Sequence, residues 1–124
     1  MRILLDTHLL LWALAAPAKL PADATRLIKE EDIYVSAASI WEISIKIALG
    51  KMRGDPREVI KALDPAGFRC LPISHEHAAR VLGLPPVHKD PFDRMLVAQA
   101  LSEPMILLTN DSALAGYGEI VRAV

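Results

Sequence analysis

The chain has 124 residues, which suits one domain and is too short for two ordinary ones. Hydrophobic residues make up 52% of it and charged residues 23%, a composition that excludes a disordered or collagen-like chain. The single cysteine, Cys70, excludes an intrachain disulfide and a thiolate zinc site, and it is compatible with the cytoplasmic location that we expect. The formal net charge of −1 excludes attraction of nucleic acid by a bulk basic field, so any such binding needs a local patch.

Apolar runs of strand length alternate along the chain with helical patterns. Strands are expected at residues 2–5, 33–35, 68–71, 105–108 and 120–124. Helices are expected at residues 9–15, 22–30, 39–49, 56–63, 74–83, 92–102 and 111–115. This alternation predicts an α/β fold in a single domain spanning residues 1–124, with a mainly parallel sheet of four to five strands between two layers of helices.

The longest apolar run, Leu9–Ala16, is far shorter than a membrane span. Residues 1–18 also allow a different interpretation as a secretory signal peptide, with Arg2 as its positive region. The polar residues Asp6, Thr7 and His8 interrupt the segment that would have to be hydrophobic. We therefore expect Met1 to open a folded domain.

Four acidic residues fall at related places in this pattern. Asp6 directly follows the first predicted strand, and Asp111 follows the strand at 105–108. Glu42 lies near the start of the helix after the second strand, and Asp93 lies in the first turn of the helix at 92–102. Carboxyl ends of parallel strands and the helix starts that follow them share one edge of the sheet, where ligands bind in open α/β folds. We therefore expect these four acids to meet in one cleft.

Each acid also has an ordinary explanation in helix capping. Asp6 and Asp111 can each cap the next helix. Glu42, three residues after Ser39, matches a capping box, and Asp93 suits the positive end of a helix dipole. For any one acid alone, capping is the better interpretation.

Burial favours a shared site over four separate caps. Asp93 leads an apolar helical face of Leu96, Val97 and Ala100, and apolar residues flank Asp6 on both sides. A buried carboxylate is costly unless it has a partner. Because hard oxygen ligands suit Mg²⁺ or Mn²⁺, one metal-binding cluster explains all four acids with a single cause.

Four segments, in this order along the chain, carry a resemblance to a known family. They are Leu4-Leu5-Asp6-Thr7-His8 with Leu11-Trp12, Ser36-Ala37-Ala38-Ser39-Ile40-Trp41-Glu42-Ile43, His88-Lys89-Asp90-Pro91-Phe92-Asp93-Arg94-Met95-Leu96-Val97-Ala98-Gln99-Ala100, and Leu107-Leu108-Thr109-Asn110-Asp111. With these segments the chain resembles the PIN-domain nucleases, and most closely the VapC-type ribonuclease toxins of bacterial toxin–antitoxin pairs. Each segment alone is weak, but the ordered set covers the chain from end to end.

The resemblance implies a three-layer α/β/α fold and cleavage of RNA phosphodiesters with Mg²⁺ or Mn²⁺. The acidic quartet of the family falls here on Asp6, Glu42, Asp93 and Asp111, as catalytic and metal-binding residues. It also implies a VapB-like antitoxin as partner, and we expect a homodimer and no membrane association. The number of metal ions, and which carboxylate orients the attacking water, stay open.

Further polar residues are assigned supporting roles. Asp90, Thr109 and Asn110 are expected to support the acids, although residues of these types also belong to ordinary turns. Expected RNA contacts, each with a solvated surface position as its alternative, are Lys46, Lys51, Arg53, Lys89 and Arg94.

The histidines and the large apolar residues receive structural interpretations. Two positions apart on a helix, His75 and His77 make a poor metal pair. Structural roles are expected for His8 and His88. Core positions are expected for Trp12, Trp41 and Cys70.

Two functions from other classes compete with the nuclease. A phosphotransfer protein also places Asp at a strand end, but it needs a lysine after a later strand, and no lysine follows Lys89. No glycine-rich phosphate loop is present either. The other competitor is a metal-free interaction module with the same fold. The intact acidic quartet argues against that module, because an idle site has no reason to keep buried acids.

Overall fold

The computed structural model describes residues 1–124. The strands are β1 (Arg2–Leu5), β2 (Asp32–Ser36), β3 (Arg69–Leu71), β4 (Ile106–Thr109) and β5 (Val121–Ala123). The α-helices are α1 (Thr7–Ala15), α2 (Ala22–Glu30), α3 (Ala37–Ala48), α4 (Pro56–Leu63), α5 (His75–Arg80) and α6 (Pro91–Ser102). The 3₁₀ helices are η1 (Pro17–Lys19), η2 (Val81–Gly83) and η3 (Ser112–Tyr117). The predicted elements are present, but the helix expected at 74–83 divides into α5 and η2, and the last predicted helix is η3.

The five strands form one sheet in the order β3-β2-β1-β4-β5, and every neighbouring pair is parallel. β1 is central, so that Leu4 lies opposite Tyr34 of β2 and Leu107 of β4. From β1 the chain moves outward to β2 and β3, and then returns to the other side of β1 for β4 and β5. The direction therefore switches between β1 and β4. The expected mainly parallel sheet is confirmed as an all-parallel one.

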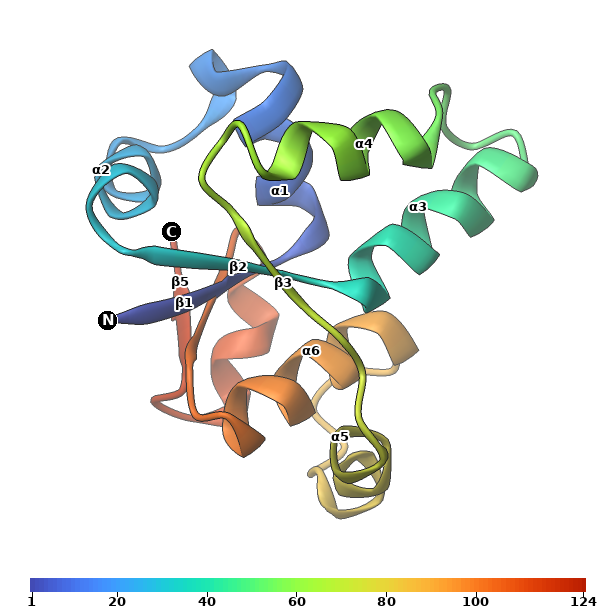
Figure 1. Cartoon of the computed structure of the whole chain (residues 1–124). Coiled ribbons are helices and arrows are strands. Elements are labelled where there is room, and N and C mark those ends of the chain that lie inside the picture. The colour runs from blue at the N-terminus through green and yellow to red at the C-terminus, as the bar shows by residue number, and fades with distance from the viewer.

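Alternation of side chains along the strands divides the core between the two faces of the sheet. Ile3 and Leu5 of β1 pack with Leu9 of α1 and Leu27 of α2. Leu4 packs on the opposite face. On that face α6 contributes Leu96, Val97, Ala98 and Ala100. Figure 1 shows α1, α2 and α4 on one side of the sheet and α5 and α6 on the other, which is the predicted three-layer arrangement.

Two residues predicted for the core lie at the surface. Cys70 is exposed because β3 is a three-residue edge strand that pairs only with β2. Trp41 is 55% exposed on α3, where it lines an open groove together with Ile60 of α4 and Leu71 of β3. Its ring meets the edge of the Phe92 ring, with 5.1 Å between centroids. Trp12, in contrast, packs partly buried against the core.

The start of α3 differs from the sequence interpretation. Ser36 rather than Ser39 caps this helix, because its Oγ accepts the backbone N–H of Ala38 at 2.9 Å. The capping-box interpretation of Glu42 is therefore wrong, since Glu42 lies beyond the first turn. The Ser36 hydroxyl also donates to Gln99 of α6, which ties the two helices that flank the site.

The segment with the alternative interpretation as a signal peptide forms the central strand β1 and helix α1. Leu9 and Leu10 within it are fully buried in the core. None of the helices combines the length and the apolar character that crossing a bilayer requires.

Candidate active site

Asp6 and Asp111 lie where the chain switches direction between β1 and β4. Asp6 directly follows β1 and caps α1, while Asp111 follows β4 after one intervening residue and caps η3. Because the carboxyl ends of neighbouring parallel strands lie side by side, these two residues come together from opposite ends of the sequence. Capping and clustering are thus both present at these two positions.

The Asp6 carboxylate is held by three donors. Its Oδ1 accepts the backbone N–H of Leu9 at 2.8 Å, and its Oδ2 accepts the Thr109 hydroxyl and the backbone N–H of Asn110, the latter at 3.2 Å. The Thr109 Oγ1 in turn accepts the backbone N–H of Asp111 at 3.0 Å. Thr109 is buried and links the two acids directly, whereas Asn110 acts through its main chain and its side chain is exposed.

Glu42 enters the site from the middle of α3. Its residue is only 6% exposed, and its Oε2 lies 2.9 Å from the Nζ of Lys46. The two residues are one helical turn apart, so both side chains point to the same side. The lysine thereby offsets part of the cost of burying the Glu42 charge.

The start of α6 supplies two more acids. Asp90 caps the helix, with its Oδ1 accepting the backbone N–H groups of Phe92 and Asp93 at 2.8 and 3.1 Å. Asp93 lies in the first turn, and its carboxylate accepts no hydrogen bond from the chain. Its nearest positively ionisable neighbour is the Nε2 of His88, 3.9 Å from Asp93 Oδ2. Asp93 is therefore the acid of the cluster without a protein donor.

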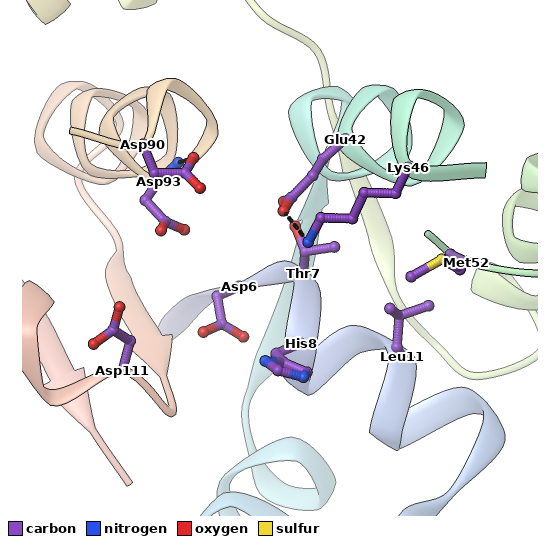
Figure 2. Close-up of a pocket in the computed structure, with 10 residues that line it drawn as sticks. All are labelled: Asp6, Thr7, His8, Leu11, Glu42, Lys46, Met52, Asp90, Asp93 and Asp111. Carbon is purple, nitrogen blue, oxygen red and sulfur yellow. Dashed lines mark hydrogen bonds and ion pairs between the residues drawn. The ribbon is translucent and has the colours of Figure 1, made fainter. Parts of the chain in front are cut away.

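Figure 2 shows the acids around one open pocket of about 200 Å³. The carboxylates of Asp6, Glu42, Asp93 and Asp111 lie around a common space, and Asp90 stands at its margin. The remaining lining residues are Thr7, His8, Leu11, Lys46 and Met52. The structure thus brings together all four acids that the sequence singles out, together with Asp90, which the sequence analysis assigned a supporting role. Lys46 is the one lysine or arginine among the lining residues.

Burial and mutual repulsion change the ionisation of these groups. Burial raises the pKa of Asp93 to about 7, with help from the nearby charges of Asp90 and Glu42 and against the influence of His88. Burial also raises the pKa of Asp6, although the hydrogen bonds that it accepts oppose the change. A site that holds several carboxylates at such cost is typical of a functional position.

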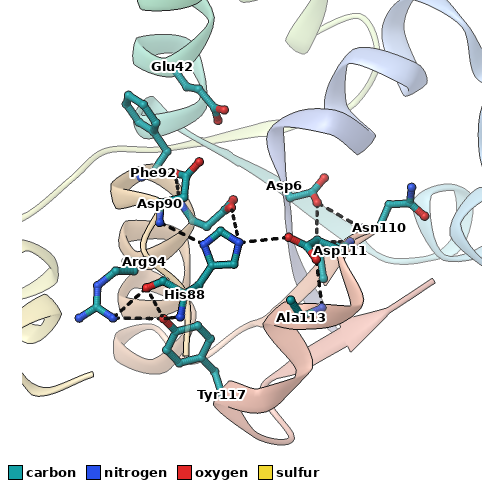
Figure 3. A network of polar contacts seen from close by, with 12 residues as sticks. Asp6, Glu42, His88, Asp90, Phe92, Arg94, Asn110, Asp111, Ala113 and Tyr117 are labelled. Atoms are coloured by element: carbon teal, nitrogen blue, oxygen red, sulfur yellow. Dashed lines mark hydrogen bonds and ion pairs between the residues drawn. The ribbon is translucent and has the colours of Figure 1, made fainter. Parts of the chain in front are cut away.

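His88 is a site residue that the sequence analysis placed in a structural role. Its Nε2 lies 3.3 Å from Asp111 Oδ2 and 3.9 Å from Asp93 Oδ2, and Figure 3 shows the ring directed toward Asp111. One nitrogen or oxygen atom from each of these three residues falls within 4.8 Å of the others. The position of His88 two residues before the helix cap Asp90 is the sequence feature that relates it to the acids, because a short loop keeps it beside the first turn of α6.

The basic residues expected to contact RNA have different positions. Lys46 lines the pocket, and Lys51 and Arg53 are exposed on either side of Met52, which also lines it. Lys89 is exposed in the loop before α6. Arg94 is not available as expected. Its guanidinium donates to the main-chain oxygens of Val81, Pro85 and His88 and to the hydroxyl of Tyr117, and so braces the loop.

A family model described as the PIN domain matches residues 3–120. The chain belongs to the PIN domain family. PIN domains are generally nucleases, and the acidic pocket lies within the matched residues. No curated protein matches the chain.

Several solved structures have the same fold, and one of them is described as a toxin–antitoxin complex. VapBC2 from Rickettsia felis, bound to a DNA fragment from its promoter, gives a TM-score of 0.72 at 15% identity, covering 99% of this chain and 98% of that one. A toxin–antitoxin complex from Klebsiella pneumoniae gives 0.67 at 18% identity, covering 98% and 96%. FitAcB from Neisseria gonorrhoeae gives 0.66 at 20% identity, covering 98% and 96%. These similarities show that the PIN fold extends over the whole chain.

The donor set of this PIN domain fits a small divalent cation. Five carboxylates and one lysine line the pocket, so that positive charge is in short supply. The carboxylate of Asp93 has no donor from the chain, and burial, with the charges of Asp90 and Glu42, raises its pKa to about 7. Oxygen ligands of this kind suit Mg²⁺ and Mn²⁺, and the small volume suits an ion with its water rather than an organic cofactor.

Proposed function

We propose that this PIN domain is a metal-dependent endoribonuclease, and that it is the toxin of a VapBC-type toxin–antitoxin pair. The observation that carries the proposal is the pocket of converging acids at the switch point of the sheet. Asp6, Glu42, Asp93 and Asp111 would hold one or two Mg²⁺ or Mn²⁺ ions. Such an ion, when bound, neutralises the phosphate and lowers the pKa of a water molecule.

The residues of the chain have separate tasks in this proposal. Asp6 is fixed by its hydrogen bonds and supplies a rigid ligand position. Asp93, which lacks a donor, supplies the charge that the cation neutralises. Lys46, paired with Glu42, is 44% exposed in its side chain and can turn to a phosphate oxygen of the substrate.

RNA is the proposed substrate because basic residues surround the pocket, while acidic residues that can hold a metal ion line it. Lys46, Lys51, Arg53 and Lys89 supply local positive charge, while the whole chain has a formal net charge of −1. Weak general attraction of this kind favours recognition of RNA shape and of a few unpaired nucleotides over binding of any sequence. We also propose a cytoplasmic location.

The experiment incubates the purified chain with total RNA in Mg²⁺, in Mn²⁺ or in EDTA, and maps the cut sites by sequencing. Discrete cuts that require metal and disappear in Asp93→Asn would support the proposal. Asp64→Asn is the matched control, because Asp64 is an exposed acid outside the pocket. Cleavage that persists in EDTA would contradict the mechanism. Absence of any cleavage, together with tight binding to a protein partner, would favour the metal-free interaction module.

The antitoxin partner is supported by the charge of the pocket and by the kind of complex in which the fold recurs. A free ribonuclease is hazardous to its own cell, so a partner has to block the site. We propose that the antitoxin inserts an arginine among the carboxylates, because a planar guanidinium pairs well with several of them at once.

An apolar groove beside the acids provides the remaining contact surface in this proposal. It runs between α3, α4 and the edge strand β3, and its apolar lining includes Ile40, Trp41, Ile60, Leu63, Leu71 and Pro72. Trp41 and Ile60 are 55% and 48% exposed, and Trp41 directly precedes the pocket residue Glu42. A segment that places an arginine in the pocket can therefore continue with its apolar side chains in the groove.

Co-expression with the neighbouring open reading frame tests the partner. The chain alone should arrest growth, and its partner should restore growth and co-purify with it. Ile60→Asp should weaken the complex while RNA cleavage continues, whereas Leu82→Asp, at a 93% exposed residue of η2, should leave the complex intact. A chain that is harmless alone and retains no partner would refute the toxin role even if it cleaves RNA. The predicted homodimer is tested on the same preparation by light scattering.

A further inference from the structure

His88 has a ring orientation that its neighbours determine. The backbone N–H of Asp90 lies 3.1 Å from His88 Nδ1 and donates to it. A backbone N–H can only donate, so Nδ1 must present its lone pair, and the proton of the neutral ring is then on Nε2. The Nε2 atom lies 3.3 Å from Asp111 Oδ2, within ion-pair distance, and 3.9 Å from Asp93 Oδ2.

The alternative role for this ring is that of a metal ligand, since His88, Asp93 and Asp111 lie close enough together to hold an ion. Ligation through Nε2 needs the lone pair on Nε2 and therefore the proton on Nδ1. The Nδ1–H would then point at the backbone N–H of Asp90, and two donors would face each other. The local geometry opposes ligation and favours a donor.

The main chain of His88 is fixed by residues from two other elements (Figure 3). Its N–H donates to the hydroxyl of Tyr117 on η3 at 3.0 Å, and its carbonyl oxygen accepts from the same hydroxyl and from Arg94 of α6, each at 3.4 Å. Arg94 also donates to the Tyr117 hydroxyl at 3.1 Å. Asp111 caps η3, and Tyr117 ends it. The hydrogen bonds between Tyr117 and the main chain of His88 therefore also set the distance between His88 and Asp111.

A glycine allows this close approach. A Cβ added to Gly116, next to Tyr117, would come within 2.8 Å of the Cγ1 of Val87, next to His88. The loop before α6 and the turn η3 are therefore in tight contact at the residues that carry the network.

We infer that His88 is a positioning residue of the acidic site: its Nε2, 3.3 Å from Asp111 Oδ2, holds the carboxylate of Asp111 in place, and His88 is not a metal ligand. Arg94, expected from the sequence to contact RNA, acts with Tyr117 to hold His88. The consequence for cleavage rests on the proposed function, but the geometry of the ring does not.

Long-range ¹H–¹⁵N NMR of the imidazole nitrogens tests the geometry without any RNA. The resonances of His88 are assigned by their loss in His88→Gln, with His75→Ala as a control for an exposed histidine outside the site. We expect the Nε2–H tautomer in the metal-free protein, and the same tautomer in saturating Mg²⁺. An Nδ1–H tautomer, or an Nε2 that loses its proton when Mg²⁺ is added, would overturn the inference and make His88 a ligand.

Cleavage by variants tests the role. Removing an outer partner of a metal ligand typically lowers activity by about 10- to 100-fold, and we expect His88→Ala to show this loss in kcat with little change in KM. His88→Gln, whose amide offers an N–H near the position of Nε2, should recover most of it, and His75→Ala should match the unmodified chain. Activity of His88→Ala equal to that of the unmodified chain, or His88→Gln no better than His88→Ala, would overturn the role. If the unmodified chain cleaves no RNA, the proposed function fails, while the NMR result still decides the state of the ring.

Discussion

Replacing Asp93 with asparagine is expected to stabilise the metal-free protein at alkaline pH and to remove its binding of divalent cations. Asp93 is 22% exposed in its side chain, and its carboxylate faces Asp6, Glu42, Asp90 and the His88 ring without accepting a hydrogen bond. Asparagine has nearly the same shape but carries no charge to be buried or repelled. The substitution therefore isolates the charge.

The magnitude follows from the pKa of Asp93, which burial and the charges of Asp90 and Glu42 raise from 3.8 to about 7. At about 1.4 kcal/mol per pKa unit, ionising this carboxyl costs the folded state at most about 4 kcal/mol, less to the extent that solvent reaches the group. The pKa of Asp93 is higher in the folded than in the unfolded chain. The contribution of this carboxyl to the free energy of unfolding is therefore fully present below pH 3.8 and is lost as the pH rises through about 7. Roughly 2–3 kcal/mol of this loss falls between pH 5 and pH 8.

Thermal unfolding in EDTA at pH 5 and pH 8 measures the effect. For a chain of this size, a difference of about 2–3 kcal/mol corresponds to a Tm difference on the order of 10 °C. The Tm of Asp93→Asn minus the Tm of the unmodified chain should be larger at pH 8 than at pH 5 by this amount. Added Mg²⁺ should raise the Tm of the unmodified chain but not that of Asp93→Asn. An Asp93→Asn advantage that is the same at both pH values, or no advantage at pH 8, would refute the argument from buried charge.

Three further predictions follow from the site and its supports. In calorimetric titration with Mn²⁺, binding should be lost in Asp6→Asn as well as in Asp93→Asn, and affinity equal to that of the unmodified chain in both would remove these acids from the metal site. Thr109→Val should lower the free energy of unfolding in urea by about 1–3 kcal/mol, because the buried Thr109 hydroxyl donates to Asp6 and accepts from Asp111, and an unchanged midpoint would contradict this link. Arg94→Gln should lower the Tm without changing the salt dependence of RNA binding, whereas Lys51→Ala combined with Arg53→Ala should make that dependence shallower; a shallower slope in Arg94→Gln would restore Arg94 as an RNA contact.

The arrangement of the acids could be predicted because it depends on the order of strands and helices. Asp6 follows a strand and Asp111 follows another, and in a parallel sheet both must lie at the same edge. Asp93 follows from helical periodicity, since it leads an apolar face, and Glu42 follows from its place near the start of the helix after the second strand. Periodicity and the succession of strands and helices along the chain are properties that one sequence contains.

The features that the sequence did not predict depend on contacts between distant segments. Local sequence patterns do not show which distant segments will meet. Whether Cys70 is covered depends on β3 being the edge strand. Whether Trp41 is covered depends on the open groove that α3, α4 and β3 leave between them. Arg94 resembles a surface arginine until the loop before α6 folds over it. His88 is held beside the acids because its main-chain N–H donates to the hydroxyl of Tyr117, which lies at the end of η3, 29 residues later in the chain.

The most direct test of the central claim is the reversible dependence of RNA cleavage on a divalent cation held by the acidic pocket. One RNA that the chain cuts at a mapped site is incubated with the chain in EDTA, and excess Mg²⁺ or Mn²⁺ is then added. Cleavage at that site should be absent in EDTA and should return with the metal in the unmodified chain and in Asp64→Asn, but not in Asp93→Asn. Cleavage in EDTA, or return of cleavage in Asp93→Asn to the rate of the unmodified chain, would contradict the account.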